Sequence, residues 1–189
     1  MKKVIHYHHL DHPDREYLLS QIDKYKSKDQ GLTSVILTAA DCNVYQPYYR
    51  GSKFEHYEDF ERVRKDLVPW VRNLLKDNRY WIPKSCWALD YENGEGAWTH
   101  THHNTDYSLI WYLRADEGCA TIEFFDPDVS IQPTEGMALL FLGSHKHGVL
   151  PNIDINARRT CLVFDIVKME DAPKKSQKRG FYDIDEEFL

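Results

Sequence analysis

The sequence predicts an α+β protein in which helices come first and a sandwich or barrel of short strands follows. Helical patterns stand in the first 80 residues, whereas from Trp81 onward the chain is a series of short β-prone runs separated by turn residues. Strands that recur roughly every 8–12 residues are typical of sandwiches and barrels. Because helices and strands are segregated along the chain, the pattern favours α+β over an alternating α/β fold.

Composition limits the function classes. The 189 residues fit one domain, and 42% hydrophobic with 13% aromatic residues provide a core, which excludes global disorder. A net charge of −6 disfavours nucleic-acid binding through phosphate neutralisation. No apolar run is long enough to span a membrane, and four widely spaced cysteines without a C-x-x-C motif are typical of reduced thiols. We therefore expect a soluble, cytoplasmic protein.

The elements of the first part follow from local patterns. Residues 12–28 repeat apolar side chains at helical spacing, and Gly31 ends the pattern; residues 32–40 are rich in β-branched residues and predict a strand. Residues 56–78 give the strongest helical pattern, and Pro69 should kink or split that helix. Residues 1–80 are therefore predicted to form a support layer of helices and a strand.

From Trp81 onward the chain is predicted to form strands. The predicted strand runs are WIPKSCWALDY (81–91), AWTHTHH (97–103), YSLIWYLRA (107–115), ATIEFFD (120–126), MALLFLG (137–143), HGVLP (147–151) and RRTCLVFDIVK (158–168). The turn residues between them are Asn93-Gly94, Gly118, Asp126-Pro127, Pro133, Gly136 and Asn152. We place the barrel core at residues 81–169 and a charged tail at residues 170–189.

Histidines concentrate beside one of these strands. On an extended strand, residues i and i+2 face the same side, so His100 and His102 point together and His103 points away. A third ligand must come from another strand, where His147 and His145 are the candidates. Such a set leaves half of the coordination sphere open, as in non-haem iron oxygenases, although one of their ligands is normally a carboxylate.

Other residues of metal-binding types stand near this motif in the sequence or near the N-terminus. Asp106 has the parity of His102, but it lies about 13 Å further along an extended strand and reaches the metal only if the chain turns sharply. A dense cluster of histidines near the N-terminus, which we expect to be solvated or packed at the barrel edge, comprises His6, His8, His9 and His12.

From about Trp81 to Val167 the sequence resembles the Fe(II)/2-oxoglutarate-dependent dioxygenases of the prolyl-hydroxylase-like branch. The landmarks that carry the resemblance appear in the family's order: Tyr91 with the Gly94/Gly96 loop, His100-x-His102, Ser108 to Leu113, Gly118 to Phe125, Pro133-x-x-Gly136, His147-Gly-Val-x-Pro151 and Arg158-Arg159. The family has His-x-Asp or His-x-Glu at the first metal motif. A His-x-His pattern there resembles some smaller bacterial and phage-associated relatives.

The resemblance implies a double-stranded β-helix, a jelly-roll or cupin-like barrel, with the N-terminal helices packed on it. It implies Fe(II) held by His100, His102 and His147, with imidazole also suiting other metals. It further implies that Arg159 grips the far carboxylate of 2-oxoglutarate. Tyr112 is expected to hydrogen-bond to that same carboxylate, Tyr91 to lie near the metal end, and Arg158 to be the alternative cation.

The reaction implied by the resemblance splits O₂. One oxygen atom enters 2-oxoglutarate, which yields succinate and CO₂, and the other hydroxylates a C–H bond of a substrate. That substrate, a small molecule or a peptide, is not specified by the sequence, and neither is the oligomeric state. It is expected at the barrel mouth, against loops 43–57 and 126–132 and the tail.

Two other readings of the histidines remain open. One is a three-histidine cupin-type metalloenzyme that does not use 2-oxoglutarate. Gly94-x5-His100-x-His102 fits the first cupin motif, but Gly136 stands 11 residues before His147, farther than in cupins. The other is a non-catalytic β-barrel binding module. Arg159, which follows the distal histidine, favours the 2-oxoglutarate enzyme.

Overall fold

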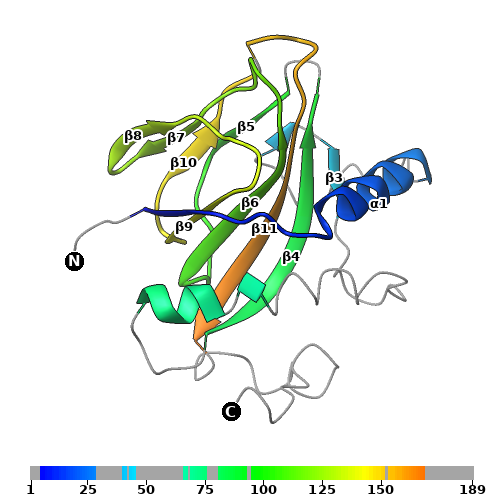
Figure 1. The fold of residues 1–189 in the computed structure, drawn as a ribbon. Helices are drawn as coiled ribbons and strands as arrows, with labels where there is room; N and C mark the ends of the chain where they lie inside the picture. Colours follow the sequence, from blue (N-terminus) through cyan, green and yellow to red (C-terminus); the bar gives the residue numbers. More distant parts are fainter. Residues whose placement is uncertain are drawn as a thin grey trace.

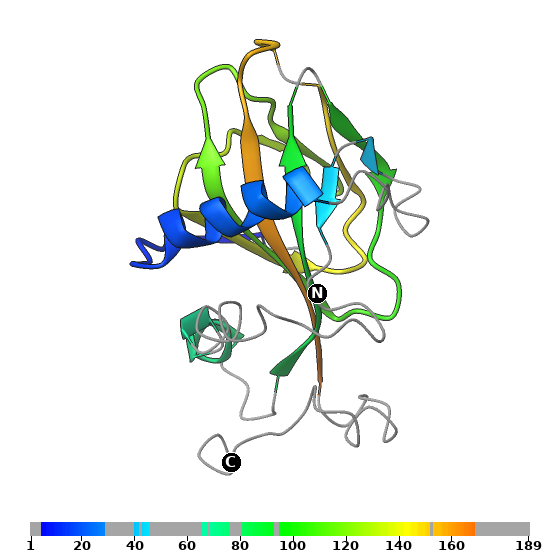
Figure 2. The ribbon, with the colours of Figure 1, turned by 90° about the vertical axis from the view of Figure 1, so that its right-hand side faces the viewer.

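The computed structural model describes residues 5–28, 40–41, 43–45, 66–67, 69–75, 81–92, 95–151 and 153–168. In this part of the chain, two antiparallel sheets face each other, and helix α1 (Arg15–Lys28) crosses the outer face of the larger sheet (Figures 1 and 2). The predicted α+β barrel with a helix packed on it is thereby confirmed.

The larger sheet has six strands, in the order β1-β9-β6-β11-β4-β3. Their bounds are β1 His6–His9, β3 Asn43–Tyr45, β4 Trp81–Tyr91, β6 Tyr107–Ala115, β9 Met137–Leu142 and β11 Arg159–Lys168. β1 pairs with β9 at one edge of the sheet, so three of the N-terminal histidines lie at the barrel edge. The fourth, His12, is buried and hydrogen-bonded to Asp66.

The smaller sheet has five strands, in the order β2-β5-β10-β7-β8. Their bounds are β2 Ala40–Asp41, β5 Gly96–His100, β7 Ile122–Phe125, β8 Asp128–Ile131 and β10 His147–Val149. β8 corrects the prediction of a loop over residues 126–132. Phe125 pairs with Asp128, so Asp126-Pro127 is a two-residue hairpin turn, after which the β-branched Val129 and Ile131 extend the strand.

Two apolar clusters hold these layers together. Between the larger sheet and the helices, Leu18 and Ile22 of α1 pack with Leu67 and Val71, which lie in a helical segment over residues 66–67 and 69–75, and with Trp111 of β6. The other cluster lies between the two sheets and includes Tyr112, Phe124, Phe141 and Val163. β6 is therefore buried on both faces, which explains why its sequence is apolar without alternation.

Several predicted features lie outside the described residues. These are most of the strand at 32–40, the first turns of the helix at 56–78, Gly94 and the tail at 170–189. The loop predicted at 43–57 is corrected at residues 43–45, which form β3, and its remaining residues also lie outside the described part. Within the described helices, none is long and apolar enough to cross a membrane.

Candidate metal centre

Two neighbouring strands of the smaller sheet bring His100 and His147 together. His147 of β10 pairs directly with His100 of β5, and Val149 pairs with Ala97. The paired positions are two residues apart on β10 but three residues apart on β5, so β5 contains a bulge. Ala97 packs into the inter-sheet core, and strict alternation would turn a residue three positions later outward. The extra residue of the bulge instead turns His100 inward, toward His147.

The bulge also places two consecutive residues of β5 on the outer surface. Its residues Trp98 and Thr99 are both exposed, and the Trp98 side chain is 72% exposed. The backbone carbonyl of Trp98 nevertheless points to the histidines, because it lies 2.6 Å from Nδ1 of His100. The bulge therefore both aims the ring of His100 and supplies its hydrogen-bond partner.

His102 reaches the site by another route than the one predicted from strand parity. β5 ends at His100, and His102 stands in the loop that follows. Asn104, at φ 57°, has the left-handed conformation that reverses the chain. The His102 N–H donates to the carbonyl of Gly143 (2.8 Å), and its ring stacks on Trp87 with centroids 5.8 Å apart. The loop and its packing, rather than the strand, thus hold this ring.

Gly143 provides a test of that loop, because its missing side chain makes room for the loop backbone. A Cβ added at Gly143 would overlap the carbonyl oxygen of Thr105 and would lie 3.2 Å from that of His102. We expect Gly143→Ala to cost about 1–3 kcal/mol of unfolding free energy. It should also weaken metal binding, because the loop must move. Urea unfolding and metal titration measure the two effects, and an unchanged metal affinity would show that His102 tolerates the shift.

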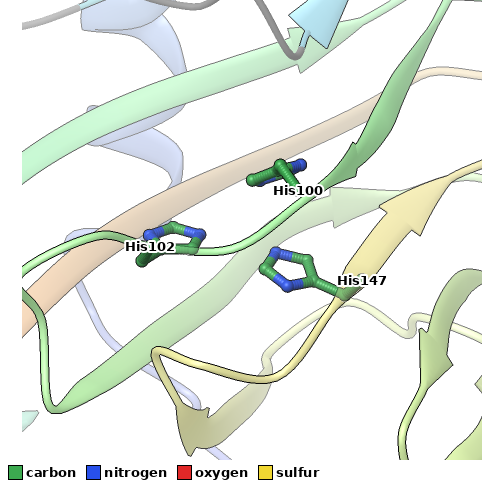
Figure 3. A group of neighbouring side chains, drawn as sticks. All are labelled: His100, His102 and His147. Carbon is green, nitrogen blue, oxygen red and sulfur yellow. The ribbon is translucent and has the colours of Figure 1, made fainter.

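The three rings converge on a common point. One ring nitrogen from each of His100, His102 and His147 can be chosen so that the three lie within 4.8 Å of one another, and the ring centroids are 4.4 to 5.4 Å apart. Figure 3 shows the side chains turned toward one another from β5, the loop after it and β10. Metal–imidazole bonds of about 2.0–2.1 Å place such nitrogens roughly 3 Å apart. A small inward movement therefore completes the site.

Hydrogen bonds on the far side of each ring fix its tautomer. Nδ1 of His100 lies 2.6 Å from the carbonyl of Trp98, and Nδ1 of His147 lies 2.9 Å from the carbonyl of His145. Nδ1 of His102 lies 2.7 Å from Oδ1 of Asp165. Carbonyl and carboxylate oxygens accept, so each Nδ1 carries the proton. Each Nε2 then keeps a lone pair for a metal, as in metal sites whose ligands are oriented by outer partners.

Burial keeps the imidazoles in the neutral form that binds metal. Burial lowers the pKa of His147 to about 3, and repulsion from His100 acts in the same direction. The pKa of His100 is also lowered, mainly by burial and secondarily by His102. Because a protonated imidazole cannot coordinate, these shifts mean that metal does not compete with protons at neutral pH for these two ligands.

The alternative ligands lie outside this group. Within the described residues, the cluster of possible ligands comprises His100, His102 and His147, without Asp106 or His145. The backbone of Asp106 is tied to Ile166 and Gly143, and His145 contributes its carbonyl to His147. His103 is exposed, as expected.

Arg159 lies on the inner face of β11, buried to 1% exposure. Its Nη1 donates to the carbonyl of Ala120 (2.9 Å), and its guanidinium carbon lies 4.2 Å above the ring of Tyr91. Nε and Nη2 are buried and have no hydrogen-bond partner within the described structure. We expected Tyr91 near the metal end; the contact that the structure shows is with Arg159.

In the part of the chain that the structure describes, the neighbours of Arg159 supply no negative charge. Burial raises the pKa of the Tyr112 hydroxyl, and it raises the pKa of the Cys161 thiol to about 12. The pKa of Cys119 is raised for the same reason. All three groups are therefore neutral beside a charged guanidinium. Burying a cation without a counter-charge costs several kcal/mol, and an anion bound beside Arg159 would offset that cost.

Arg158 points to the opposite face and is already paired. Its Nε and Nη2 donate to the two carboxylate oxygens of Asp90 at 2.8 and 3.0 Å, and Nη2 also donates to Asp23. Asp90 accepts a further hydrogen bond from Thr160 (2.7 Å). Arg158 thus belongs to an ion-pair network that includes α1, and Arg159 is the cation that faces the interior.

Asp90 is expected to be a major contributor to stability. It is fully buried, and Asp90→Ala would leave Arg158 with an incomplete set of partners. Removal of one partner of a buried ion pair costs about 3–5 kcal/mol, which urea unfolding measures. The control is Asp23→Ala, whose side chain is 52% exposed and whose loss should cost less than about 1 kcal/mol. Equal losses would contradict this assignment.

Comparisons with known proteins identify the fold. The chain is similar to the collagen prolyl hydroxylase of Paramecium bursaria Chlorella virus-1, solved with 2-oxoglutarate (TM-score 0.66, 14% identity, 87% of this chain and 96% of that one). It is similar to a Pseudomonas putida prolyl-4-hydroxylase (0.61, 15%, 87% and 93%). It also resembles HygX of Streptomyces hygroscopicus, solved with nickel and 2-oxoglutarate (0.60, 13%, 87% and 82%).

No sequence-family model matches the chain, and no curated protein matches it in sequence. At these identities the structural matches show a shared fold. They confirm the predicted double-stranded β-helix, the fold of 2-oxoglutarate-dependent Fe(II) oxygenases, across most of the chain.

Proposed function

We propose that this protein is a non-haem Fe(II)- and 2-oxoglutarate-dependent oxygenase that hydroxylates a C–H bond of a substrate and releases succinate and CO₂. One observation carries the proposal: the same barrel interior holds a three-histidine cluster and a buried guanidinium that has no counter-charge among the described residues. A dicarboxylate that chelates a metal at one end and needs a cation at the other fits both features.

His100, His102 and His147 would hold the metal. Three imidazole ligands would leave room at the metal for further ligands, and imidazole suits Fe(II) among other metals. When bound there, iron and 2-oxoglutarate supply the O₂-dependent oxidation. The chain itself contributes neutral ligands with fixed tautomers and an apolar wall that includes Phe124 and Phe141.

Arg159 would bind the far carboxylate. Its unpartnered Nε and Nη2 lie along one edge of the guanidinium, the edge that pairs with both oxygens of a carboxylate. Tyr91 supports the guanidinium plane, and the neutral hydroxyl of Tyr112 offers a further donor. HygX, a protein of the same fold, was solved with nickel and 2-oxoglutarate bound, which supports the pairing of metal and dicarboxylate in this barrel.

The first experiment is anaerobic. Fe(II) and then 2-oxoglutarate are added to metal-free protein, and the visible spectrum is recorded. A weak charge-transfer band that requires both additions is expected, because it reports chelation of 2-oxoglutarate at an open iron site. Succinate release would then be used to screen substrates.

The same experiment separates the other readings. Iron binding without the band would favour a three-histidine cupin-type enzyme that does not use 2-oxoglutarate, a reading supported by the absence of a carboxylate from the ligand cluster among the described residues. Failure to bind iron would leave a non-catalytic barrel.

A further inference from the structure

One of the three imidazoles has a different kind of outer partner from the other two. His100 and His147 are hydrogen-bonded to backbone carbonyls, whereas Nδ1 of His102 is bonded to the carboxylate of Asp165 at 2.7 Å. Both side chains are largely buried, at 7% and 15% exposure. A charge-assisted hydrogen bond of this kind is stronger than one to a neutral carbonyl.

Asp165 reaches this position from the inner face of β11. The alternating residues Arg159, Cys161, Val163 and Asp165 share one face of the strand, and Cys161 and Val163 lie in the inter-sheet core. Asp165 thus brings a carboxylate into a largely apolar interior, where an unpaired charge costs several kcal/mol. The Asp165 carboxylate there accepts a hydrogen bond from a ring of the candidate metal centre, which gives this placement a function.

His102 needs such a partner more than the other ligands do. It stands in a loop rather than in a strand, and its ring is otherwise held by stacking on Trp87 and an edge contact with Phe141. Stacking leaves the ring free to exchange the two nitrogens by a half-turn. An acceptor at Nδ1 removes that freedom and directs Nε2 to the metal.

We propose that Asp165 is a positioning residue that supplies the carboxylate of this metal centre through His102. The inference rests on the proposed function, because it concerns the same three-histidine site. In the set of two histidines and one carboxylate, the negative charge binds the metal directly. Here the carboxylate of Asp165 contacts a candidate ligand rather than the metal position. It fixes the tautomer of His102 and makes its Nε2 a stronger donor.

The test begins with Asp165→Asn, which keeps the side-chain shape and removes the charge. The dissociation constant for Fe(II), measured anaerobically, should rise by about 10–100-fold. With 2-oxoglutarate bound, the charge-transfer band should move to shorter wavelength, because a weaker donor at position 102 leaves the iron less electron-rich. A purely structural role of Asp165 would not move the band. Asp128→Asn, the same change at an exposed position of β8, should alter neither quantity.

A second pair of variants keeps the test decisive if Asp165→Asn also lowers stability. His102→Asp places a carboxylate at the ligand position itself, so Asp165 loses its hydrogen bond to the His102 ring and becomes a like charge nearby. In that background Asp165→Asn should leave Fe(II) affinity unchanged or improve it. An equal loss of affinity in both backgrounds would overturn the proposal, because Asp165 would then not act through His102.

The outcomes also distinguish this inference from the proposed function. If the wild-type protein binds Fe(II) and shows the band while Asp165→Asn matches it in affinity and spectrum, the oxygenase proposal stands and the role of Asp165 is refuted. If the wild-type protein binds no Fe(II), the metal site itself is refuted, and the role of Asp165 with it.

Discussion

Replacing His147 with alanine is expected to abolish Fe(II) binding while the barrel remains folded. His147 is the central ligand of the cluster: it pairs with His100 across the sheet, and its ring centroid lies 4.4 Å and 5.2 Å from those of His100 and His102. Two remaining imidazoles form a much weaker site, so the Fe(II) dissociation constant should rise by more than the roughly 100-fold limit seen for outer partners of ligands. Anaerobic titration of the purified variant measures the change.

The matched control is His145→Ala. His145 is also buried and stands two residues earlier in the same segment, but its hydrogen bond to His147 comes from its backbone carbonyl, which alanine keeps. Fe(II) binding should therefore survive. The reverse pattern, with binding lost in His145→Ala and kept in His147→Ala, would exchange the two ligand assignments. Thermal melting of both metal-free variants shows that the comparison concerns folded protein.

Arg159→Met is expected to keep Fe(II) and lose 2-oxoglutarate. The variant retains all three histidines but removes the two unpartnered donors, Nε and Nη2. Without ligands its stability should equal or exceed that of the wild type, because a buried cation without a counter-charge is replaced by an apolar side chain of similar size. Added 2-oxoglutarate should raise the melting temperature of the Fe(II)-loaded wild type, since binding at 100 times Kd contributes about 2.7 kcal/mol. The variant should not respond.

Arg158→Met provides the opposite result from the adjacent position. Arg158 pairs with Asp90 on the other face of the strand, so its loss should lower stability and leave the response to 2-oxoglutarate intact. The two variants are thus expected to differ in opposite ways. Arg159→Met should lose 2-oxoglutarate binding and keep its stability, whereas Arg158→Met should lose stability and keep binding. If Arg159→Met still gained stability from 2-oxoglutarate, the assignment of the far carboxylate to Arg159 would be wrong.

The fold and the three histidines that the structure brings together were predictable from the sequence because both depend on local patterns. Turn residues at short intervals delimit the strands, and the spacing of His100, His102 and His147 follows a known motif. The way in which His102 reaches the site was not predictable from parity. A bulge and a chain reversal at Asn104 depend on backbone contacts between strands, which no single segment encodes.

Asp165 was missed for a related reason. It lies 63 residues from His102 in the sequence, so their hydrogen bond exists only after β11 has entered the sheet. A signal was nevertheless present, because Asp165 interrupts an apolar run, LVFDIV, on the face that also carries Arg159. A lone charged residue on the buried face of a strand requires a partner. The His100-x-His102 motif offered a candidate for that partner.

β11 carries Arg159, which we propose for one end of the cosubstrate site, and Asp165, the hydrogen-bond partner of His102 at the metal centre. Arg159 and Asp165 stand six residues apart on its inner face, about 20 Å along an extended strand, and β4 and β6 hold it on both sides. If the proposed function is correct, the strand would fix the distance between Arg159 and the metal centre, and a dicarboxylate would need a matching length to reach both. Succinate is one carbon shorter than 2-oxoglutarate and lacks its keto group. In the proposed reaction, the same fixed distance would therefore favour 2-oxoglutarate over succinate and promote release of the product.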